Sequence, residues 1–329
     1  MKKITSSETQ YKIAQLKEKY PAAKQFAKGK RSIVFSLGKS RCIKLSLGKV
    51  TLDREYKTLQ LLNRQGIGPK AYSYDSMLDC LEMERIYGKL IEEFASQEKS
   101  RIKVLSIIYA VAKQLFALDQ LSLSKEEMHH PAKHIIISEK GPVLIDFERC
   151  HYSGKPKNIT QFFQYLTQGA LFQIISRRGF VVLRENLRKT LKSYKEKPSE
   201  QAFYALLSQL CLSPKTDFEK IYTAARLIPK GKLATYKSIA TVSGTLPRVV
   251  GFAMSKNPFA PIVPCHRVVA SSGIGGFASG IKNKKNLLIS EGISPESLKS
   301  FLMPPNKLAS SNALFLKKLK KKPKQNQNL

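Results

Sequence analysis

A cysteine stands directly before a histidine in the segment VPCHRVVASSGIGGFASG, residues 263–280. A thiolate is a strong, soft nucleophile, and a neighbouring imidazole can hold a thiol in that ionised form near neutral pH. Pro264 fixes the turn at Cys265, and the glycines after His266 suit a flexible loop that closes over a small planar group. Glu291 offers a carboxylate that orients the imidazole. Together these residues predict a nucleophile, a base and an orienting acid, whereas the Cys-His pair alone is more typical of a buried structural thiol.

The segments upstream of this thiol predict helices that hold it. In ATYKSIATVSGTLPRVVGFAMSKNP, Thr235 caps a short helix, Gly244 lets the chain turn, and Pro247 begins a second helix, which predicts a helix-turn-helix. After Arg248 the second helix carries mostly small or apolar residues. Such a helix suits either close approach to a narrow DNA groove or tight packing in a core. We expect a mainly helical domain over residues 216–295.

The first part of the chain predicts an α+β domain over residues 1–192. Residues 31–46 alternate apolar and polar types, as in a hairpin, and TLDREYKTLQLLNRQG indicates a helix that ends at Gly66. SIIYAVAKQLFALDQL predicts a longer helix, and KHIIIS with GPVLIDFERC predicts a second hairpin. The polar residues 193–215 are expected to form a linker. The basic tail over 296–329 is expected to be disordered from Asn306 onward.

The charge of the chain favours a polyanionic partner. Its 329 residues include 57 Lys and Arg against 24 Asp and Glu, a formal net charge of +33. This excess predicts binding to nucleic acid, although a generally lysine-rich proteome would also produce it. Five scattered cysteines without a CxxC pair predict reduced thiols in a cytoplasmic protein rather than disulfides or a zinc site. No signal peptide and no membrane span are expected.

The region from about Phe218 to Ile293 resembles the O6-alkylguanine-DNA alkyltransferases, also called methylated-DNA-protein-cysteine methyltransferases, above all in its PCHRVV motif. The resemblance implies a monomeric enzyme that acts without a cofactor on double-stranded DNA containing O6-alkylguanine and moves the alkyl group irreversibly to its own cysteine. It also implies the catalytic roles, which are Cys265 as alkyl acceptor, His266 as its activating base, Glu291 as the holder of that base, Tyr236 as the group that neutralises the departing guanine, and Asn257 as the residue that shapes the thiol's turn.

The same resemblance implies the DNA contacts. Arg248 fills the gap that an extruded nucleotide leaves, and the further DNA-binding residues are Thr235, Gly251, Ala253 and Arg267. The chain departs from the family at two places. Phe277 stands where most relatives carry a tyrosine, so a hydroxyl near O6 is missing. The α/β domain that usually precedes this region in the family is also expected to be absent.

The N-terminal domain resembles protein kinases, especially the small atypical kinases of the RIO and Bud32 type. Lys44 in RCIKLS and Glu55 in REYKTLQLL match the lysine and glutamate pair, and Asp146 in LIDF matches the magnesium ligand. His129 and His134 stand where the catalytic aspartate and the second metal-binding asparagine belong. The resemblance implies a bilobal domain, with an antiparallel sheet lobe and a helical lobe. It implies a degenerate kinase that binds ATP and Mg²⁺ or serves as a docking module.

Taken singly, a strand lysine and a helix glutamate are more often a surface pair than a nucleotide clamp. The sequence therefore leaves three functions open. The first is DNA repair by stoichiometric transfer to Cys265. The second is a lesion sensor that binds alkylated DNA without chemistry, and the third is an active atypical kinase tethered to DNA.

Overall fold

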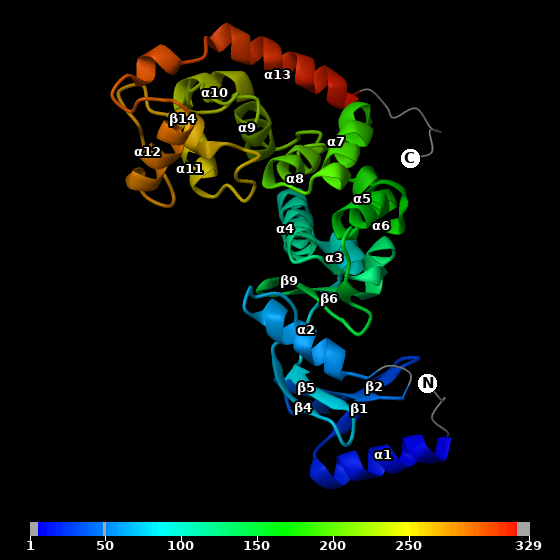
Figure 1. The fold of residues 1–329 in the computed structure, drawn as a ribbon. Coiled ribbons are helices and arrows are strands. Elements are labelled where there is room, and N and C mark those ends of the chain that lie inside the picture. Colours follow the sequence, from blue (N-terminus) through cyan, green and yellow to red (C-terminus); the bar gives the residue numbers. More distant parts are fainter. Residues whose placement is uncertain (1–5, 49–50, 321–329) are drawn as a thin grey trace. The chain divides into compact units, whose positions relative to one another are not determined.

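The hairpin predicted over residues 31–46 is present and forms the middle of a five-stranded antiparallel sheet (Figure 1). The computed structural model describes residues 6–48 and 51–320. Val34 pairs with Lys44, and Phe35 pairs with Ile43. The strand order is β1-β2-β3-β5-β4, and the strands are β1 (Lys24–Lys28), β2 (Ser32–Leu37), β3 (Arg41–Ser46), β4 (Ala71–Asp75) and β5 (Cys80–Glu84).

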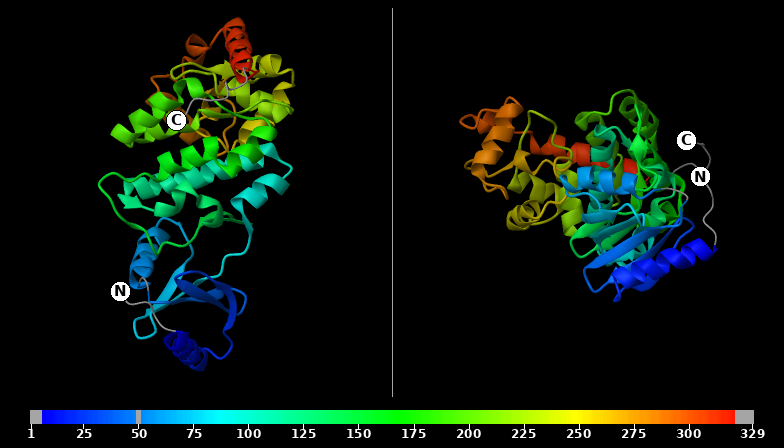
Figure 2. Two further views of the ribbon diagram at one scale, coloured as in Figure 1. Left: turned by 90° about the vertical axis from the view of Figure 1, so that its right-hand side faces the viewer. Right: turned by 60° about the horizontal axis from the view of Figure 1, so that its bottom comes forward.

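Helices pack against both faces of this sheet. Because successive side chains of a strand point to opposite faces, neighbouring residues of β3 contact different helices. Helix α1 (Ser6–Lys19) lies along the sheet in Figure 2 and packs Leu16 into one core with Phe35 and Ile43. Lys44 points to the opposite face, where it meets Glu55 of helix α2 (Asp53–Asn63). As predicted, this helix stops before Gly66, whose φ of 69° is the left-handed conformation that favours glycine.

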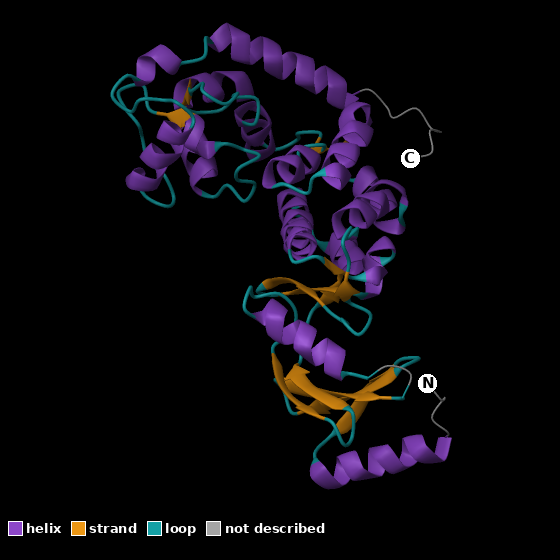
Figure 3. Cartoon of the chain, viewed as in Figure 1, coloured by secondary structure: helices purple, strands orange, loops and turns teal. Residues whose placement is uncertain are grey.

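Helices dominate the chain after the sheet (Figure 3). The second predicted hairpin is confirmed, because β8 pairs antiparallel with β9, and β6 adds to β8. The predicted long helix is α4, which begins earlier than its apolar run. These elements are β6 (Lys89–Leu90), α3 (Ile91–Gln97), α4 (Arg101–Gln120), β7 (Leu123–Ser124), β8 (Ile135–Ser138), β9 (Gly141–Leu144), β10 (His151–Tyr152), α5 (Asn158–Gln168) and α6 (Ala170–Arg177).

The boundary between the two compact units differs from the sequence prediction. One unit comprises Met1–Lys99 with Lys103–Ile174, and the other comprises Ser100–Ile102 with Ile175–Leu329. The predicted linker over 193–215 is folded, because its apolar residues recur at helical spacing and are buried among the polar ones. It contributes to α7 (Arg184–Glu196), α8 (Glu200–Leu207) and β12 (Leu210–Leu212), which pairs with β11 (Phe180–Val182).

The second unit contains the two helices and the turn predicted around Gly244. Thr235 caps the first helix by accepting a hydrogen bond of 3.0 Å from the Ser238 N–H, Gly244 has a φ of 67°, and Pro247 begins the second helix. The elements are α9 (Asp217–Ala225), β13 (Ala234–Thr235), α10 (Tyr236–Ser243), α11 (Pro247–Ser255), β14 (Val268–Val269), which pairs parallel with β13, and α12 (Ile281–Ser290).

The expectation of a disordered tail is wrong for its first part. Residues Pro305–Lys320 form helix α13, which contacts α9 and α10. The helix is ordered because Leu308 and Leu319 are buried among its lysines. The chain reaches it through backbone hydrogen bonds between Leu233 and Met303 at 2.7 Å and between Leu233 and Phe301 at 2.9 Å. Residues 321–329, the rest of the predicted tail, lie outside the described residues.

The structure also bears on the predictions about membrane-spanning segments and about free cysteine thiols. None of their helices combines the length and the apolar composition that crossing a bilayer requires. All five cysteines lie in the described part of the chain and are free thiols, as the sequence predicted.

Candidate functional site

Asn257 shapes the turn that presents the thiol. Its Nδ2 donates a hydrogen bond of 2.8 Å to the Val263 carbonyl, and its Oδ1 accepts one of 3.0 Å from the Phe259 N–H. Pro264 then leads into a single 3-10 turn over Cys265–Arg267. The Cys265 side chain is partly exposed, while the other four cysteines are buried. The fold therefore presents this one thiol to solvent.

The imidazole of His266 is fixed by the carboxylate that the sequence predicted. His266 Nε2 lies 2.9 Å from Glu291 Oε1, and Arg267 donates to both oxygens of the same carboxylate, at 2.7 Å through Nη2 and at 2.9 Å through Nε. Burial by itself raises the pKa of Glu291, but hydrogen bonds from Arg267 and His266 outweigh burial and lower that pKa to about 2. Glu291 is therefore ionised at neutral pH.

His266 is neutral at pH 7. Burial lowers its pKa below the ordinary value, and the hydrogen bond to Glu291 offsets this effect only in part. Because an ionised carboxylate can only accept, the proton of the neutral ring lies on Nε2, and Nδ1 is its free acceptor. In the part of the chain that the structure describes, no direct hydrogen bond joins the Cys265 thiol to the His266 ring.

Two tyrosines, Tyr222 and Tyr236, interact electrostatically with the thiol. Burial raises the pKa of Tyr222 to about 12, and it also raises the pKa of Tyr236, while the charge of the Cys265 thiolate adds to both effects. Both phenols therefore keep their protons at neutral pH. Tyr236 donates a hydrogen bond of 3.3 Å to the Gly276 carbonyl. A side chain at Gly275 would come within 2.9 Å of the Tyr236 ring, so this loop needs glycine to reach the phenol.

A fully buried lysine joins the loop after the thiol to helix α12. Lys284 Nζ donates to the carbonyls of Val268 at 2.6 Å, Ile274 at 2.7 Å and Gly276 at 3.2 Å. Burial lowers its pKa to about 8. The sequence analysis missed this residue, although Lys284 shares a helix face with Leu288, four residues later, which is an inward position.

The alkyltransferase resemblance is confirmed for this region. Residues 217–293 match the family model described as 6-O-methylguanine DNA methyltransferase, DNA binding domain. The C-terminal region matches the O6-alkylguanine-DNA alkyltransferase family. It is similar to the methylated-DNA-protein-cysteine methyltransferase of Sulfolobus acidocaldarius, with 51% identity over 79 residues, which are 24% of this chain and 51% of that protein.

Two further proteins resemble the same region. The methylated-DNA-protein-cysteine methyltransferase of Saccharolobus solfataricus is 52% identical over 73 residues, which are 22% of this chain and 48% of that protein. A crystal structure of Atl1 from S. pombe, in complex with damaged DNA containing O6-carboxymethylguanine, is 30% identical and has a TM-score of 0.25; the match covers 27% of this chain and 95% of that one. The chain thus spans about half the length of the curated relatives it matches.

The predicted DNA-binding residues of the alkyltransferase region differ in whether the structure leaves them accessible. Arg248 is exposed on α11, and Gly251 lies beside the Tyr236 ring. The Thr235 hydroxyl is engaged as the cap of α10. Two predictions are wrong: Ala253 is fully buried, and Arg267 is held by Glu291 and by the Ile228 carbonyl at 2.7 Å. Small size and positive charge alone do not show which way a side chain faces.

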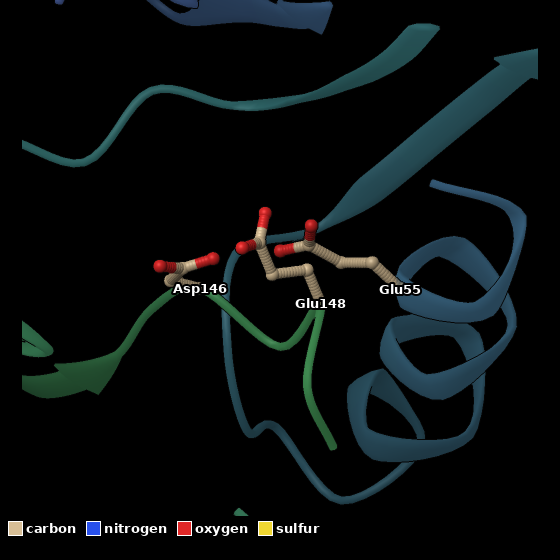
Figure 4. Close-up of side chains that lie close together, drawn as sticks. All are labelled: Glu55, Asp146 and Glu148. Carbon is tan, nitrogen blue, oxygen red and sulfur yellow. The ribbon is translucent and has the colours of Figure 1, made fainter. Parts of the chain in front are cut away.

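The second predicted set, in the N-terminal unit, also comes together, and Figure 4 shows two of its members, Glu55 and Asp146, beside Glu148. Lys44 Nζ on β3 lies 2.8 Å from Glu55, 2.7 Å from Asp146 and 3.3 Å from Glu148. Burial by itself lowers the pKa of Lys44, but the three carboxylates outweigh it and raise that pKa. Glu148 was not predicted, because it follows Asp146 at a position where the motif carries no acid.

The backbone and the neighbours of Asp146 set it apart from an ordinary surface aspartate. Its φ of 63° is costly for a residue other than glycine, and such strain gathers at functional sites. Asp146 Oδ2 lies 3.7 Å from His134 Nδ1, a buried atom that has no hydrogen-bond partner in the described part of the chain. His129 is exposed, and its Nδ1 bonds the Glu126 carbonyl at 2.8 Å, so it stands outside this cluster.

Two charged residues near Asp146 escaped the sequence analysis. Lys125 is fully buried and donates to the Asp146 carbonyl and, at 3.1 Å, to Glu127. Glu127 stands two residues before His129, so its position does not match that of the catalytic aspartate. Oxygens of Glu55, Asp146 and Glu148 lie within 4.8 Å of one another, and Mg²⁺ prefers carboxylate oxygen. Because Lys44 Nζ lies among these three carboxylates, Asp146, the most exposed of them, is the one that fits a metal ion.

Proposed function

We propose that this protein repairs DNA by moving the alkyl group of O6-alkylguanine in duplex DNA to the sulfur of Cys265, once per molecule. The observation that carries the proposal is the Cys265 thiol itself. It is partly exposed, lies within the matched region, and stands next to a neutral imidazole held by an ionised carboxylate. A sensor that only binds DNA has no use for this arrangement.

The residues account for the whole reaction. His266 Nδ1 takes the thiol proton through an intervening water, because no direct bond joins the two groups. The sulfur then attacks the alkyl carbon, so that an S–C bond forms while the bond from that carbon to O6 breaks and its electron pair stays on guanine. Tyr236 donates the proton that neutralises the guanine, and the proton that His266 took from the thiol then passes through solvent to restore the Tyr236 hydroxyl. The product is a thioether, which no group in the site reverses, and the protein acts once.

Reaching the alkyl group requires the guanine to leave the duplex. Extrusion of a base costs a few kcal/mol, which protein contacts have to offset. Arg248 supplies an exposed guanidinium near the start of α11 to occupy the space left in the stack. Gly251 lies one turn further along α11 and leaves room beside Tyr236.

The experiment compares the parent chain with Cys265→Ala on a duplex that contains one O6-methylguanine. We expect both proteins to bind the duplex, and only the parent to convert the lesion to guanine. Cys211→Ala is the matched control, because that thiol is buried and its partners are the Arg226 guanidinium and the Ser208 carbonyl rather than residues assigned to alkyl transfer. Binding by the parent without loss of the lesion would instead favour the sensor function.

As a second candidate function, we propose that the N-terminal unit binds ATP with Mg²⁺ in a kinase-like site. The supporting observation is the buried Lys44 between Glu55 and Asp146, with Asp146 in a strained conformation. Lys44 would contact phosphate oxygens, and Asp146, whose side chain is 35% exposed, would hold the metal ion. Lys44→Met should abolish binding of ATP with Mg²⁺ in calorimetry, whereas Lys57→Met, on the exposed side of α2, should not. Equal binding by both variants would refute the site.

A further inference from the structure

Helix α11 exposes a large aromatic side chain on the same face as Arg248. Phe252 is 58% exposed and stands four residues after Arg248, so the two lie one above the other on the helix. Lys256, a further four residues along, is also exposed. The opposite face of the helix is buried through Val250, Ala253 and Met254. The exposed face is therefore a stripe in which one aromatic ring stands between two cations, and we call it the α11 stripe.

The Phe252 ring is supported from behind. It meets the Phe218 ring edge-on, with ring centroids 6.0 Å apart, and Phe218 in turn meets Tyr222 at 6.2 Å. Tyr222 is anchored through its hydroxyl, which donates a hydrogen bond of 2.9 Å to the Ala253 carbonyl. Because each ring rests on the next, Phe252 is held in place before any partner binds, and its burial in a complex costs little side-chain entropy.

The spacing of the α11 stripe selects a duplex as its partner. Lys256, the C-cap residue of α11, lies about 12 Å along the helix axis from Arg248. It can therefore contact a phosphate row beside the minor groove, which is about 6 Å wide, while Arg248 enters the stack. Between the two phosphate rows lie the apolar faces of the deoxyriboses and the edges of the base steps. Proteins that open the minor groove place Phe or Leu side chains there. The net charge of +33 favours the same partner over a second copy of this basic chain.

We propose that Phe252, supported by Phe218, is an apolar contact to the minor-groove wall one helical turn from Arg248, and that it holds the duplex open while Arg248 occupies the vacated space. The inference rests on the proposed repair function and adds a residue to its DNA interface. The inference makes a prediction that differs from that of a purely electrostatic contact. Removal of an apolar side chain weakens binding but leaves unchanged the number of counterions released from DNA on binding.

The test measures binding of the Phe252→Ala and Phe252→Leu chains to an O6-methylguanine duplex over a range of salt concentrations. We expect Phe252→Ala to bind about tenfold more weakly with an unchanged slope of log affinity against log salt, and Phe252→Leu to retain most of the affinity. Lys256→Ala should instead reduce the slope by about one. Leu314→Ala removes an equally exposed apolar side chain on α13 and should change nothing.

Two further measurements separate this inference from the repair function. Labelling of Cys265 by iodoacetamide without DNA should be equal in Phe252→Ala and the parent, which shows that the thiol site is intact. Fluorescence of 2-aminopurine beside the lesion should report less base extrusion in the variant. An affinity and extrusion equal to those of Leu314→Ala would overturn the inference, as would a parent that dimerises in solution through Phe252. Failure of the parent to take up the alkyl group would refute repair while leaving the binding comparison valid.

Discussion

The chemistry at Cys265 depends on where each neighbouring proton resides. Glu291 is ionised, His266 is neutral and both nearby tyrosines are protonated. The site therefore combines one proton acceptor, His266, with one donor, Tyr236, since the Tyr222 hydroxyl is engaged by the Ala253 carbonyl. The sequence predicted the proton acceptor, His266, because it is adjacent to Cys265, and the alkyltransferase resemblance implied Glu291 as the residue that holds it. It did not predict Arg267 as a partner of Glu291, since an arginine next to a DNA-binding motif is usually taken as a phosphate contact.

The first prediction concerns the pH dependence of alkyl transfer. Only the neutral imidazole accepts the thiol proton, and burial lowers the pKa of His266 from its ordinary value of 6.5. The rate is therefore expected to stay level as the pH falls through 6.5 and to decline only at lower pH. Single-turnover kinetics on the O6-methylguanine duplex measure this. A decline centred at or above 6.5 would contradict the assigned protonation states.

The second prediction concerns Glu291→Gln. The amide keeps the size of the side chain but removes the charge that holds the His266 proton on Nε2. The rate at pH 7 should fall by about a hundredfold, within the usual range for general-base catalysis. Duplex affinity, measured on the same protein, should be unchanged. An undiminished rate would show that His266 does not act through Glu291.

The third prediction concerns Lys284→Met, which leaves three carbonyls of the loop without their donor. A buried acceptor that loses its partner is costly, so the loop over residues 268–277 should loosen. We expect faster amide hydrogen exchange in that loop and a transfer rate at least about tenfold lower. Lys285→Met, at the exposed neighbouring position, is the control and should behave as the parent. Equal exchange in both variants would contradict the role of Lys284.

At the scale of elements, local signals decided what the sequence predicted. Both hairpins, α2, and the pair α10 and α11 were predicted because turn and cap residues mark their ends. Helix α13 was not, because the tail's lysines mask the few buried leucines that order it. The tail's composition is that of a disordered chain, yet Leu308 and Leu319 are eleven residues apart, or about three helical turns, and lie on one face.

The fourth prediction tests this packing of α13. Leu308 is fully buried, so Leu308→Ala should lower the free energy of unfolding by about 2 to 5 kcal/mol. Leu314, on the same helix, is 60% exposed, and Leu314→Ala should change it by less than about 0.5 kcal/mol. Denaturant titration of both variants measures the difference. Equal stability would mean that α13 is not packed.

At the scale of the whole molecule, the residues assigned to alkyl transfer all lie in one unit and those assigned to nucleotide binding all lie in the other. The sequence placed each set in the correct half, but set the boundary too late. The error arose because α7 and the residues just after it, Lys197 and Pro198, carry exposed lysines and a proline in a pattern that resembles a linker. The net charge identified the whole chain as basic, but it did not locate the surface that we propose contacts DNA.

The most direct test of the account is the intact mass of the full chain after titration with an O6-methylguanine duplex. The account predicts the gain of one methyl group, a plateau at one equivalent of lesion, and location of the added mass on the peptide that contains Cys265. Cys265→Ala should show no gain. A parent chain that binds the duplex and keeps its original mass, or that carries the methyl group on another residue, would contradict the account.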